Sequence, residues 1–167
     1  PRRPFVVEFE GGEIQVLGTS FNVNAYDDEP AIRTVLEKGR VNVVAPDRTT
    51  VRIEPGEQVV FDRRTGALTC SQVRVEDECA WRDGRLVFRN TPLDEVLHRL
   101  ARHYNVDIEF RNHSDEVFRY RATFRDETLT QIFDYLSASA DIRWRVVAPE
   151  RRDDDSYTRR RILVEQF

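Results

Sequence analysis

Two residue types are nearly missing from the chain, which has no methionine and only one lysine, Lys38, among 26 basic residues. Because a natural chain begins with methionine, we expect Pro1 to mark a cut within a longer protein. The arginines are scattered among 30 acidic residues, the net charge is −4, and no basic stripe forms. Nucleic-acid-binding domains carry such a stripe. We therefore expect no nucleic-acid partner.

Long apolar runs are also missing, and none approaches the roughly 20 residues that a membrane helix needs. Only two cysteines are present, Cys70 and Cys79, so at most one disulfide can form, and the sequence leaves open whether they are bridged. Cys70 shares a strand face with Leu68, which predicts a small buried residue, whereas Cys79 lies in a charged stretch.

The side chains that build active sites and metal centres are sparse and poorly spaced. His98 and His103 lie five residues apart on a predicted helix, about 140° apart around its axis, and His113 lies in a predicted loop. No HExxH, GxSxG, P-loop or GxGxxG pattern is present. The run Asp153-Asp154-Asp155 lacks EF-hand spacing and is interpreted as a solvated turn. We therefore expect that the protein is not an enzyme and that it has no catalytic, cofactor-binding or metal-binding residue and no cofactor.

From residue 5 to residue 75, short runs of alternating apolar and polar residues are separated by turn signals. A turn about every 8–12 residues is typical of an all-β sandwich, barrel or solenoid. Lys38-Gly39 predicts a tight hairpin between the strands on either side, and nothing predicts a helix before residue 90. We therefore predict an all-β domain, sandwich or solenoid-like, over residues 1–75.

Residues 76–83 form a charged, aperiodic stretch that predicts a linker. Its one large aromatic residue is Trp81, which we expect to pack the linker onto one domain or both, with stacking on a ligand as the alternative. A second domain then covers residues 84–167.

The second domain contains an internal repeat with a period of 36 residues and no gap. Size and polarity recur at equivalent positions, although most identities differ: Phe88/Phe124, Asn90/Asp126, Leu93/Leu129, Val96/Ile132, Leu97/Phe133, Leu100/Leu136, Asn105/Asp141, Ile108/Trp144 and Phe110/Val146. A repeat of this length accommodates a strand, a helix and a return strand. We predict two βαβ units, and hence an α+β protein.

Local signals predict where the helices and the last strand of this domain begin and end. Asn90 and Asp126 suit the N-cap positions of the two helices, and Asn105 suits the left-handed conformation that ends the first one. A final strand over residues 159–165 follows a short charged loop, which implies antiparallel pairing with the strand before it.

Three groups of motifs resemble the FecR family of anti-sigma regulators. They are Pro4-Phe5-Val6-Val7 with Val16-Leu17-Gly18-Thr19-Ser20-Phe21-Asn22-Val23; Val35-Leu36-Glu37-Lys38-Gly39-Arg40-Val41 with Pro55-Gly56-Glu57-Gln58; and Trp81, Gly84, Leu86, Phe88, Asn90, Pro92, Leu93, Val96, Leu97, Leu100, Tyr104 and Val106. The first two groups are similar to the PFxV…VLGTxFNV, LxxGxV and PGEQ signatures of the FecR domain. The third resembles the start of the family's C-terminal domain, itself similar to the short domain at the N-termini of secretins and TonB-dependent receptors.

The resemblance covers nearly all of the chain and implies the periplasmic part of a single-pass inner-membrane protein of a Gram-negative bacterium. In this family a cytoplasmic N-terminus holds an extracytoplasmic-function sigma factor. The periplasmic part senses the signalling domain of an outer-membrane TonB-dependent transporter. The resemblance also implies that the sigma-binding segment, the membrane helix and the first strands of the FecR domain lie outside this sequence, so no residue here is assigned to the sigma factor.

Two expectations concern the partner-binding surface, whose residues the sequence does not identify. A repeated unit without catalytic residues is a scaffold whose exposed strand edges bind partners by adding a strand. We expect the transporter to engage an edge of the second domain or the face that it shares with the first. If strands that cover the edge near residues 5–9 are missing, that truncated edge is expected to pair with a second copy and form a homodimer.

Two rival interpretations remain. The N-terminal signalling module of a TonB-dependent receptor or secretin shares the repeat but does not explain the β-rich first 75 residues. A cell-envelope carbohydrate-binding domain predicts exposed aromatic residues along one sheet face, whereas the aromatic residues of the first domain are expected mostly to alternate inward: Phe5, Phe9, Phe21, Tyr26 and Phe61.

Overall fold

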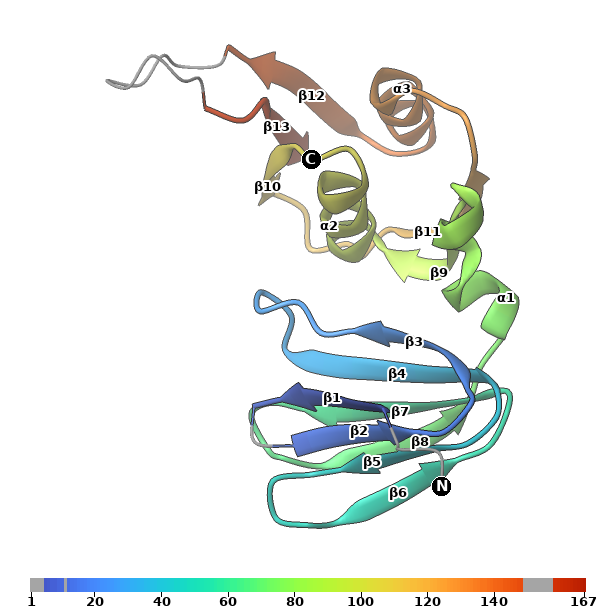
Figure 1. Ribbon diagram of the computed structural model, residues 1–167. Helices are drawn as coiled ribbons and strands as arrows, with labels where there is room; N and C mark the ends of the chain where they lie inside the picture. Colours follow the sequence, from blue (N-terminus) through green and yellow to red (C-terminus); the bar gives the residue numbers. More distant parts are fainter. Residues whose placement is uncertain (1–4, 11, 149–157) are drawn as a thin grey trace. The chain divides into compact units, whose positions relative to one another are not determined.

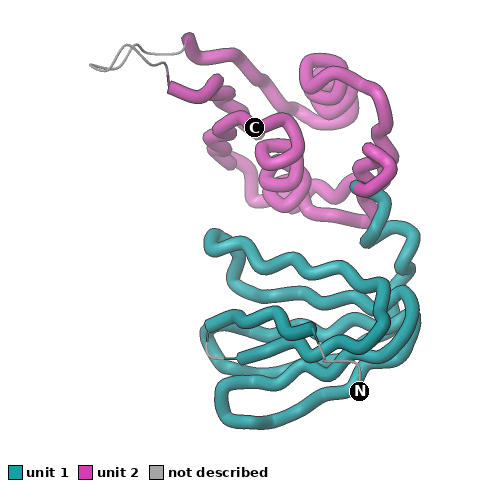
Figure 2. The backbone as a smooth tube through the Cα atoms, viewed as in Figure 1, with its two compact units in different colours: residues 1–81 teal, residues 82–167 magenta. Residues whose placement is uncertain are grey.

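The computed structural model describes residues 5–10, 12–148 and 158–167 of the chain. The chain folds as two compact units, residues 1–81 and residues 82–167 (Figure 2). Residues 76–81 of the predicted linker therefore belong to the first unit, and residues 82 and 83 belong to the second.

The first unit consists of two four-stranded antiparallel sheets, each made of two hairpins, and successive hairpins along the chain alternate between the sheets (Figure 1). One sheet has the order β1 (Phe5–Phe9), β2 (Gly12–Val16), β5 (Val41–Val44), β6 (Thr50–Ile53), and the other has the order β3 (Ser20–Asn24), β4 (Ala31–Lys38), β7 (Glu57–Asp62), β8 (Leu68–Gln72). Alternation along each strand turns its apolar side chains to one face, and both sheets contribute to one buried cluster, which includes Ile14, Val41, Leu36 and Phe61. The unit is therefore a two-layer β structure.

The predicted hairpin at Lys38-Gly39 is wrong. β4 already pairs with β3 and β7, so the chain leaves that sheet after Lys38 and enters the other one as β5. Gly39 makes the crossing possible, because its φ of +97° favours glycine and a Cβ there would lie 2.8 Å from Thr19 Oγ1 and 2.9 Å from Thr19 Cα. The local turn signal was correct, but the strands that it joins lie in different sheets.

The expectation of no helix before residue 90 is wrong, because the predicted linker is helical. It forms a one-turn helix α1 (Val75–Glu78) and a 3₁₀ turn (Ala80–Asp83). Asn22 of β3 holds this segment: its side-chain amide donates to Glu78 O at 3.3 Å, and its Oδ1 accepts from Trp81 Nε1 at 3.2 Å. Trp81 therefore anchors the segment to the first unit through its indole N–H, while 58% of the residue stays exposed.

The second unit has the predicted order of elements but not the predicted pairing. Each copy runs strand–helix–strand: β9 (Leu86–Pro92), α2 (Leu93–His103) and β10 (Asp107–Asn112), then β11 (Arg119–Phe124), α3 (Leu129–Ser139) and β12 (Ile142–Val147). However, β9 pairs with β11, and β10 and β12 flank the last strand, β13 (Arg161–Gln166), in a three-stranded sheet. The two strands of a copy thus lie in different sheets, so neither copy is a βαβ unit. The predicted antiparallel pairing of the final strand with β12 is confirmed.

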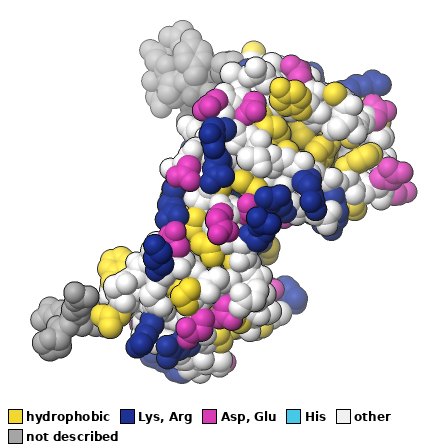
Figure 3. All heavy atoms as spheres, turned by 90° about the vertical axis from the view of Figure 1, so that its right-hand side faces the viewer, with side chains coloured by type: hydrophobic (Ala, Val, Ile, Leu, Met, Phe, Trp, Pro, Cys, Tyr) yellow, Lys and Arg dark blue, Asp and Glu magenta, His cyan; other side chains and the backbone are white. Residues whose placement is uncertain are grey.

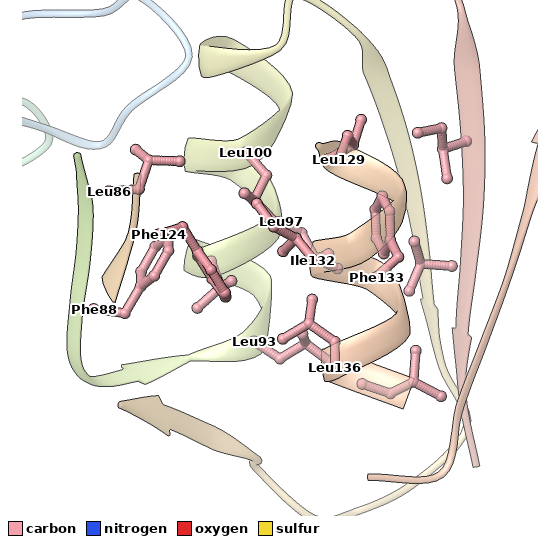
Figure 4. Close-up of a cluster of buried hydrophobic side chains, with 14 of the residues drawn as sticks. Leu86, Phe88, Leu93, Leu97, Leu100, Phe124, Leu129, Ile132, Phe133 and Leu136 are labelled. Atoms are coloured by element: carbon pink, nitrogen blue, oxygen red, sulfur yellow. The ribbon is translucent and has the colours of Figure 1, made fainter. Parts of the chain in front are cut away.

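The repeat reappears in the two helices, which both contain 11 residues and begin and end 36 positions apart. Their equivalent apolar side chains fill one core, which also receives Phe88, Phe124 and the inner face of the three-stranded sheet (Figure 4). Burial of each such side chain contributes about 1.5–3 kcal/mol. The packing of this unit therefore combines both copies.

The predicted N-caps of these helices are wrong, whereas the predicted end of α2 is confirmed. Asn90 lies within β9, at φ +56°, next to an irregularity in the β9–β11 ladder, and α2 starts after Pro92. α3 is capped by Thr128 instead of Asp126, and Gln131 completes a capping box. Asn105 follows the end of α2 with φ +51°, in the left-handed conformation expected of it.

Candidate interaction surface

The three-stranded sheet β10-β13-β12 has one apolar face and one charged face. Ile142, Ile162 and Val164 belong to the core of the second unit, and Ile108, Phe110 and Trp144 pack against it. Strand alternation turns the odd-numbered side chains of these strands to the opposite face: Asp107, Glu109 and Arg111 of β10, Arg161, Leu163 and Glu165 of β13, and Arg143, Arg145 and Val147 of β12. We call this second set the outer face.

Both lateral strands of this sheet have a free edge within the part of the chain that the structure describes, since β10 and β12 each pair only with β13. The Phe167 N–H donates to Asp141 O at 3.0 Å, so the backbone groups of Asp141 point toward the strand that contains β13. In an antiparallel ladder the direction of the backbone groups alternates, so the N–H and C=O groups of Trp144 and Val146 point away from β13. An incoming strand would find its hydrogen-bonding groups there.

The two edges carry opposite charges on the outer face. In the cross-strand rows Glu109 and Arg145 both lie beside Leu163, and Arg111 and Arg143 both lie beside Glu165. β10 thus contributes two carboxylates and one guanidinium, and Glu109 accepts from Arg111 Nη2 at 2.6 Å. β12 contributes two guanidinium groups and no acid. The β12 edge is the basic one.

An aromatic and cationic cluster lies at one end of the outer face. The rings of His113 and Phe167 stack with centroids 5.3 Å apart, and the guanidinium carbon of Arg143 lies 4.7 Å from the centre of the Phe167 ring. Phe167 and Arg143 thus make a cation–π contact. This contact keeps the Arg143 side chain on the outer face.

The histidines do not form a site. His98 lies beside Arg102, with 2.5 Å between its Nε2 and Arg102 Nη2, and the ring of His103 packs edge-on against Tyr104, with centroids 4.9 Å apart. Among residues 5–10, 12–148 and 158–167, no three His, Cys, Asp or Glu side chains are grouped so as to hold a metal ion. The run Asp153-Asp154-Asp155 lies outside the described residues.

Neither cysteine forms a disulfide, and the prediction of a buried Cys70 is wrong. Cys79 is buried, whereas Cys70 is exposed at the edge strand β8. Partial burial raises the pKa of the Cys70 thiol above its ordinary value, and the negative charge of Glu57 adds to the effect. Strand alternation alone did not reveal that this end of β8 lacks a covering layer.

The first unit exposes apolar side chains at the edge strand β1. Phe5 is 64% exposed and Val6 37%, and Leu17, directly after β2, is 51% exposed. Of the aromatic residues expected to alternate inward, Phe9 and Phe61 are buried and Phe21 packs on the core, but Phe5 and Tyr26 are exposed. Side chains of both charge signs are interspersed on the face shown in Figure 3.

No helix of the described part of the chain has the length and apolar content needed to cross a bilayer.

Residues 85–151, which lie within the second unit, match the model of the FecR C-terminal domain. Two crystal structures of a "putative anti-sigma factor" from Parabacteroides distasonis are similar to nearly the whole chain, each with 26% sequence identity and a TM-score of 0.77. The matches cover 98% and 99% of this chain and 72% of the other chain. No curated protein matches the chain. The two solved structures thus span both units.

Proposed function

Because this chain belongs to the FecR family of anti-sigma factors, we propose that it is the sensing portion of a membrane-anchored regulator in the periplasm. It receives a signal from the signalling domain of an outer-membrane TonB-dependent transporter. The regulator then passes the signal across the inner membrane to an extracytoplasmic-function sigma factor. The segment that holds the sigma factor is cytoplasmic, and we assign no residue of this chain to sigma-factor binding.

The observation that carries the proposal is the pair of free edges on the three-stranded sheet of the second unit. A free strand edge offers unpaired N–H and C=O groups, and proteins use such edges to recruit a partner strand. This unit has the family's C-terminal domain at residues 85–151, and it presents two edges that differ in charge. We assign transporter recognition to this unit.

The main rival, a signalling module of a TonB-dependent receptor or secretin, accounts for the second unit alone. The similarity to the anti-sigma factor structures extends over 98–99% of this chain and therefore includes the two-layer β unit of residues 1–81. This extent favours an anti-sigma regulator.

A binding measurement with the transporter's purified signalling domain tests the proposed function. We expect the whole chain to retain the domain on a column, and a chain that lacks residues 82–167 to lose it. The matched control is a chain that lacks residues 1–81, since each unit has its own core. Undiminished retention by residues 1–81 alone would contradict the assignment of recognition to the second unit.

We further propose that two copies associate through β1, the edge strand with exposed Phe5 and Val6. An isologous pair of β1 strands would bury these side chains and pair their free backbone groups. Sedimentation velocity of the whole chain should show a concentration-dependent dimer, and Val6→Lys should shift it to the monomer. Thr50→Lys, at the other edge of the same sheet, is the control. A dimer unaffected by Val6→Lys would exclude this edge.

A further inference from the structure

The geometry of the three-stranded sheet points to one docking edge and to the chemistry of its occupant. We propose that the free edge of β12 binds a partner strand in which acidic and apolar residues alternate. This inference rests on the proposed function, because it assigns the signalling-domain contact to one edge of the second unit.

The backbone of β12 supports strand addition. Its Trp144 and Val146 turn their N–H and C=O groups away from β13, and the strand pairs with β13 over six residues without a register shift. The β9–β11 pair, in contrast, contains a register irregularity beside Tyr120 and Arg121. Such irregularities twist an edge away from pairing. A regular edge such as that of β12 is the better template.

The side chains of β12 define what lies beside them. On the outer face the incoming strand meets Arg143 and Arg145, and Arg145 has only the apolar Leu163 opposite it on β13. On the inner face it meets Trp144, whose ring stacks on Phe133 with centroids 5.2 Å apart, and Val146, which is 41% exposed. Neighbouring strands place side chains side by side on each face. Acidic residues therefore match the outer positions, and apolar residues match the inner ones.

The other lateral strand shows why charge selects β12. The positions of β10 that are equivalent to Arg143 and Arg145 in the 36-residue repeat are Asp107 and Glu109. The two copies thus carry opposite charges at matching places on the same face. An acidic strand is attracted to the β12 edge and repelled from Asp107 and Glu109 on the β10 edge.

A second copy of this chain is a poorer occupant. Two β12 strands paired with each other would bring Arg143 and Arg145 of one copy against the same arginines of the other, and like charges across a ladder are destabilising. Pairing β12 with β10 of another copy matches the charges, but it joins different surfaces head to tail, which gives a ring or an open filament of copies instead of a pair. A separate acidic strand can pair with the β12 edge without arginine–arginine repulsion and without head-to-tail assembly.

The experiment measures the affinity of the whole chain for three probes by calorimetry. The first is the transporter's signalling domain. The second is a peptide with the sequence of residues 106–110, Val106-Asp107-Ile108-Glu109-Phe110, in which apolar and acidic residues alternate, and the third is the same peptide with Lys in place of its Asp and Glu. The variants are Arg143→Glu with Arg145→Glu, and the matched control is Asp107→Arg with Glu109→Arg on β10. Thermal unfolding checks that each variant remains folded.

We expect the β12 reversal to weaken binding of the signalling domain and of the acidic peptide by about tenfold, since two attractions become repulsions. The Lys peptide should prefer that variant, and the β10 control should bind the acidic probes at least as well as the native chain. Val146→Pro provides a backbone test, because it removes an N–H that points to the free edge and not one that bonds β13. It should abolish binding of the acidic peptide while thermal unfolding remains cooperative.

Equal affinity of the signalling domain for the native chain and the β12 variant would overturn the edge assignment and leave the proposed function intact. If the signalling domain fails to bind the native chain while the acidic peptide binds it and is lost on β12 reversal, the proposed function fails and the edge assignment holds. If the native chain self-assembles as its concentration rises, and charge reversal on either β10 or β12 abolishes this assembly, the occupant of the β12 edge is a second copy and not a separate partner strand.

Discussion

Val87 of β9 and Thr123 of β11 lie directly opposite each other in their antiparallel ladder. They are 36 positions apart, so each is the equivalent of the other in the internal repeat. The neighbouring pairs follow the same relation. When each residue of the Phe88–Ala122 pair is replaced by its equivalent in the other copy, the result is the Phe124–Leu86 pair, which is also present in the ladder. An approximate local twofold axis therefore passes through the Val87–Thr123 pair. The two copies associate as the subunits of an isologous dimer do.

The same relation recurs in the three-stranded sheet. Glu109 and Arg145, also equivalent residues, both lie beside Leu163 of β13. A single strand has one direction, so β13 is parallel to β10 and antiparallel to β12. The last strand thus occupies the position between two symmetry-related strands and leaves each with one free edge. Pairing across the copies explains why neither copy is a βαβ unit.

The contact of Phe88 with Phe124 joins the two copies and predicts energetic coupling. Their rings meet edge to face, with centroids 6.0 Å apart. Replacement of each by Leu, singly and together, should give a coupling free energy of about 0.5–1.5 kcal/mol in urea unfolding. Phe88→Leu combined with Phe133→Leu is the control, because the Phe133 ring stacks on Trp144. Additive effects for Phe88 and Phe124 would show that the copies are packed independently here.

The capping box at the start of α3 predicts a measurable loss of stability on truncation. Thr128 Oγ1 accepts from the Gln131 N–H at 3.3 Å, and the Gln131 side chain accepts from the Thr128 N–H at 2.8 Å. Thr128→Ala should lower the free energy of unfolding of the second unit by about 1 kcal/mol. Thr130→Ala, at an exposed position of the first turn, should change it far less. Equal effects of the two substitutions would exclude the capping contribution.

Tyr104 predicts a fall in stability at alkaline pH. Its hydroxyl donates to Glu127 O at 2.5 Å, and burial, with the negative charge of Glu127 adding to it, raises the pKa of Tyr104 above its ordinary value of 10.0. As the pH rises through that value, the unfolded chain releases this proton first, so the free energy of unfolding decreases. The contribution is fully present below the ordinary value and is lost toward the folded one.

Urea unfolding of the native chain and of Tyr104→Phe from pH 8 to pH 11 measures this contribution. Tyr104→Phe should be less stable at pH 8, because the Glu127 carbonyl loses its donor, and it should decline less steeply above pH 10. Burial also raises the pKa of Tyr120, so a residual decline is expected in the variant. Parallel curves for the two proteins would assign the alkaline decline to other groups.

The two cysteines, which form no disulfide, predict two classes of thiol. Ellman's reagent should titrate one thiol in the folded chain, that of exposed Cys70, and a second thiol only after unfolding, because Cys79 is 4% exposed. The raised pKa of Cys70 should make its reaction slower near neutral pH than that of a free thiol, since the thiolate is the nucleophile. Cys70→Ser should remove the fast thiol. Detection of no thiol after unfolding without reductant would reveal a disulfide.

The sequence alone was enough to predict the period of each segment, the internal repeat and the apolar faces of its helices. These features depend on contacts between residues near each other along the chain, as at Leu93, Val96, Leu97 and Leu100, whose spacing defines one helix face. It also indicated Asn105 as the end of α2, because few residue types adopt the left-handed conformation readily.

The pairing of the strands, in contrast, depends on the whole fold. Alternation tells which face of a strand is buried, but not which strand lies beside it. For this reason the turn at Lys38-Gly39 was interpreted as a hairpin although it crosses between sheets, and Asn90 was interpreted as a cap although it lies within β9. The same limit applies to the candidate surface. Nothing in the sequence distinguishes Arg143 and Arg145 from the other arginines of the chain. The position of β13 between β10 and β12 places them on a strand with a free edge.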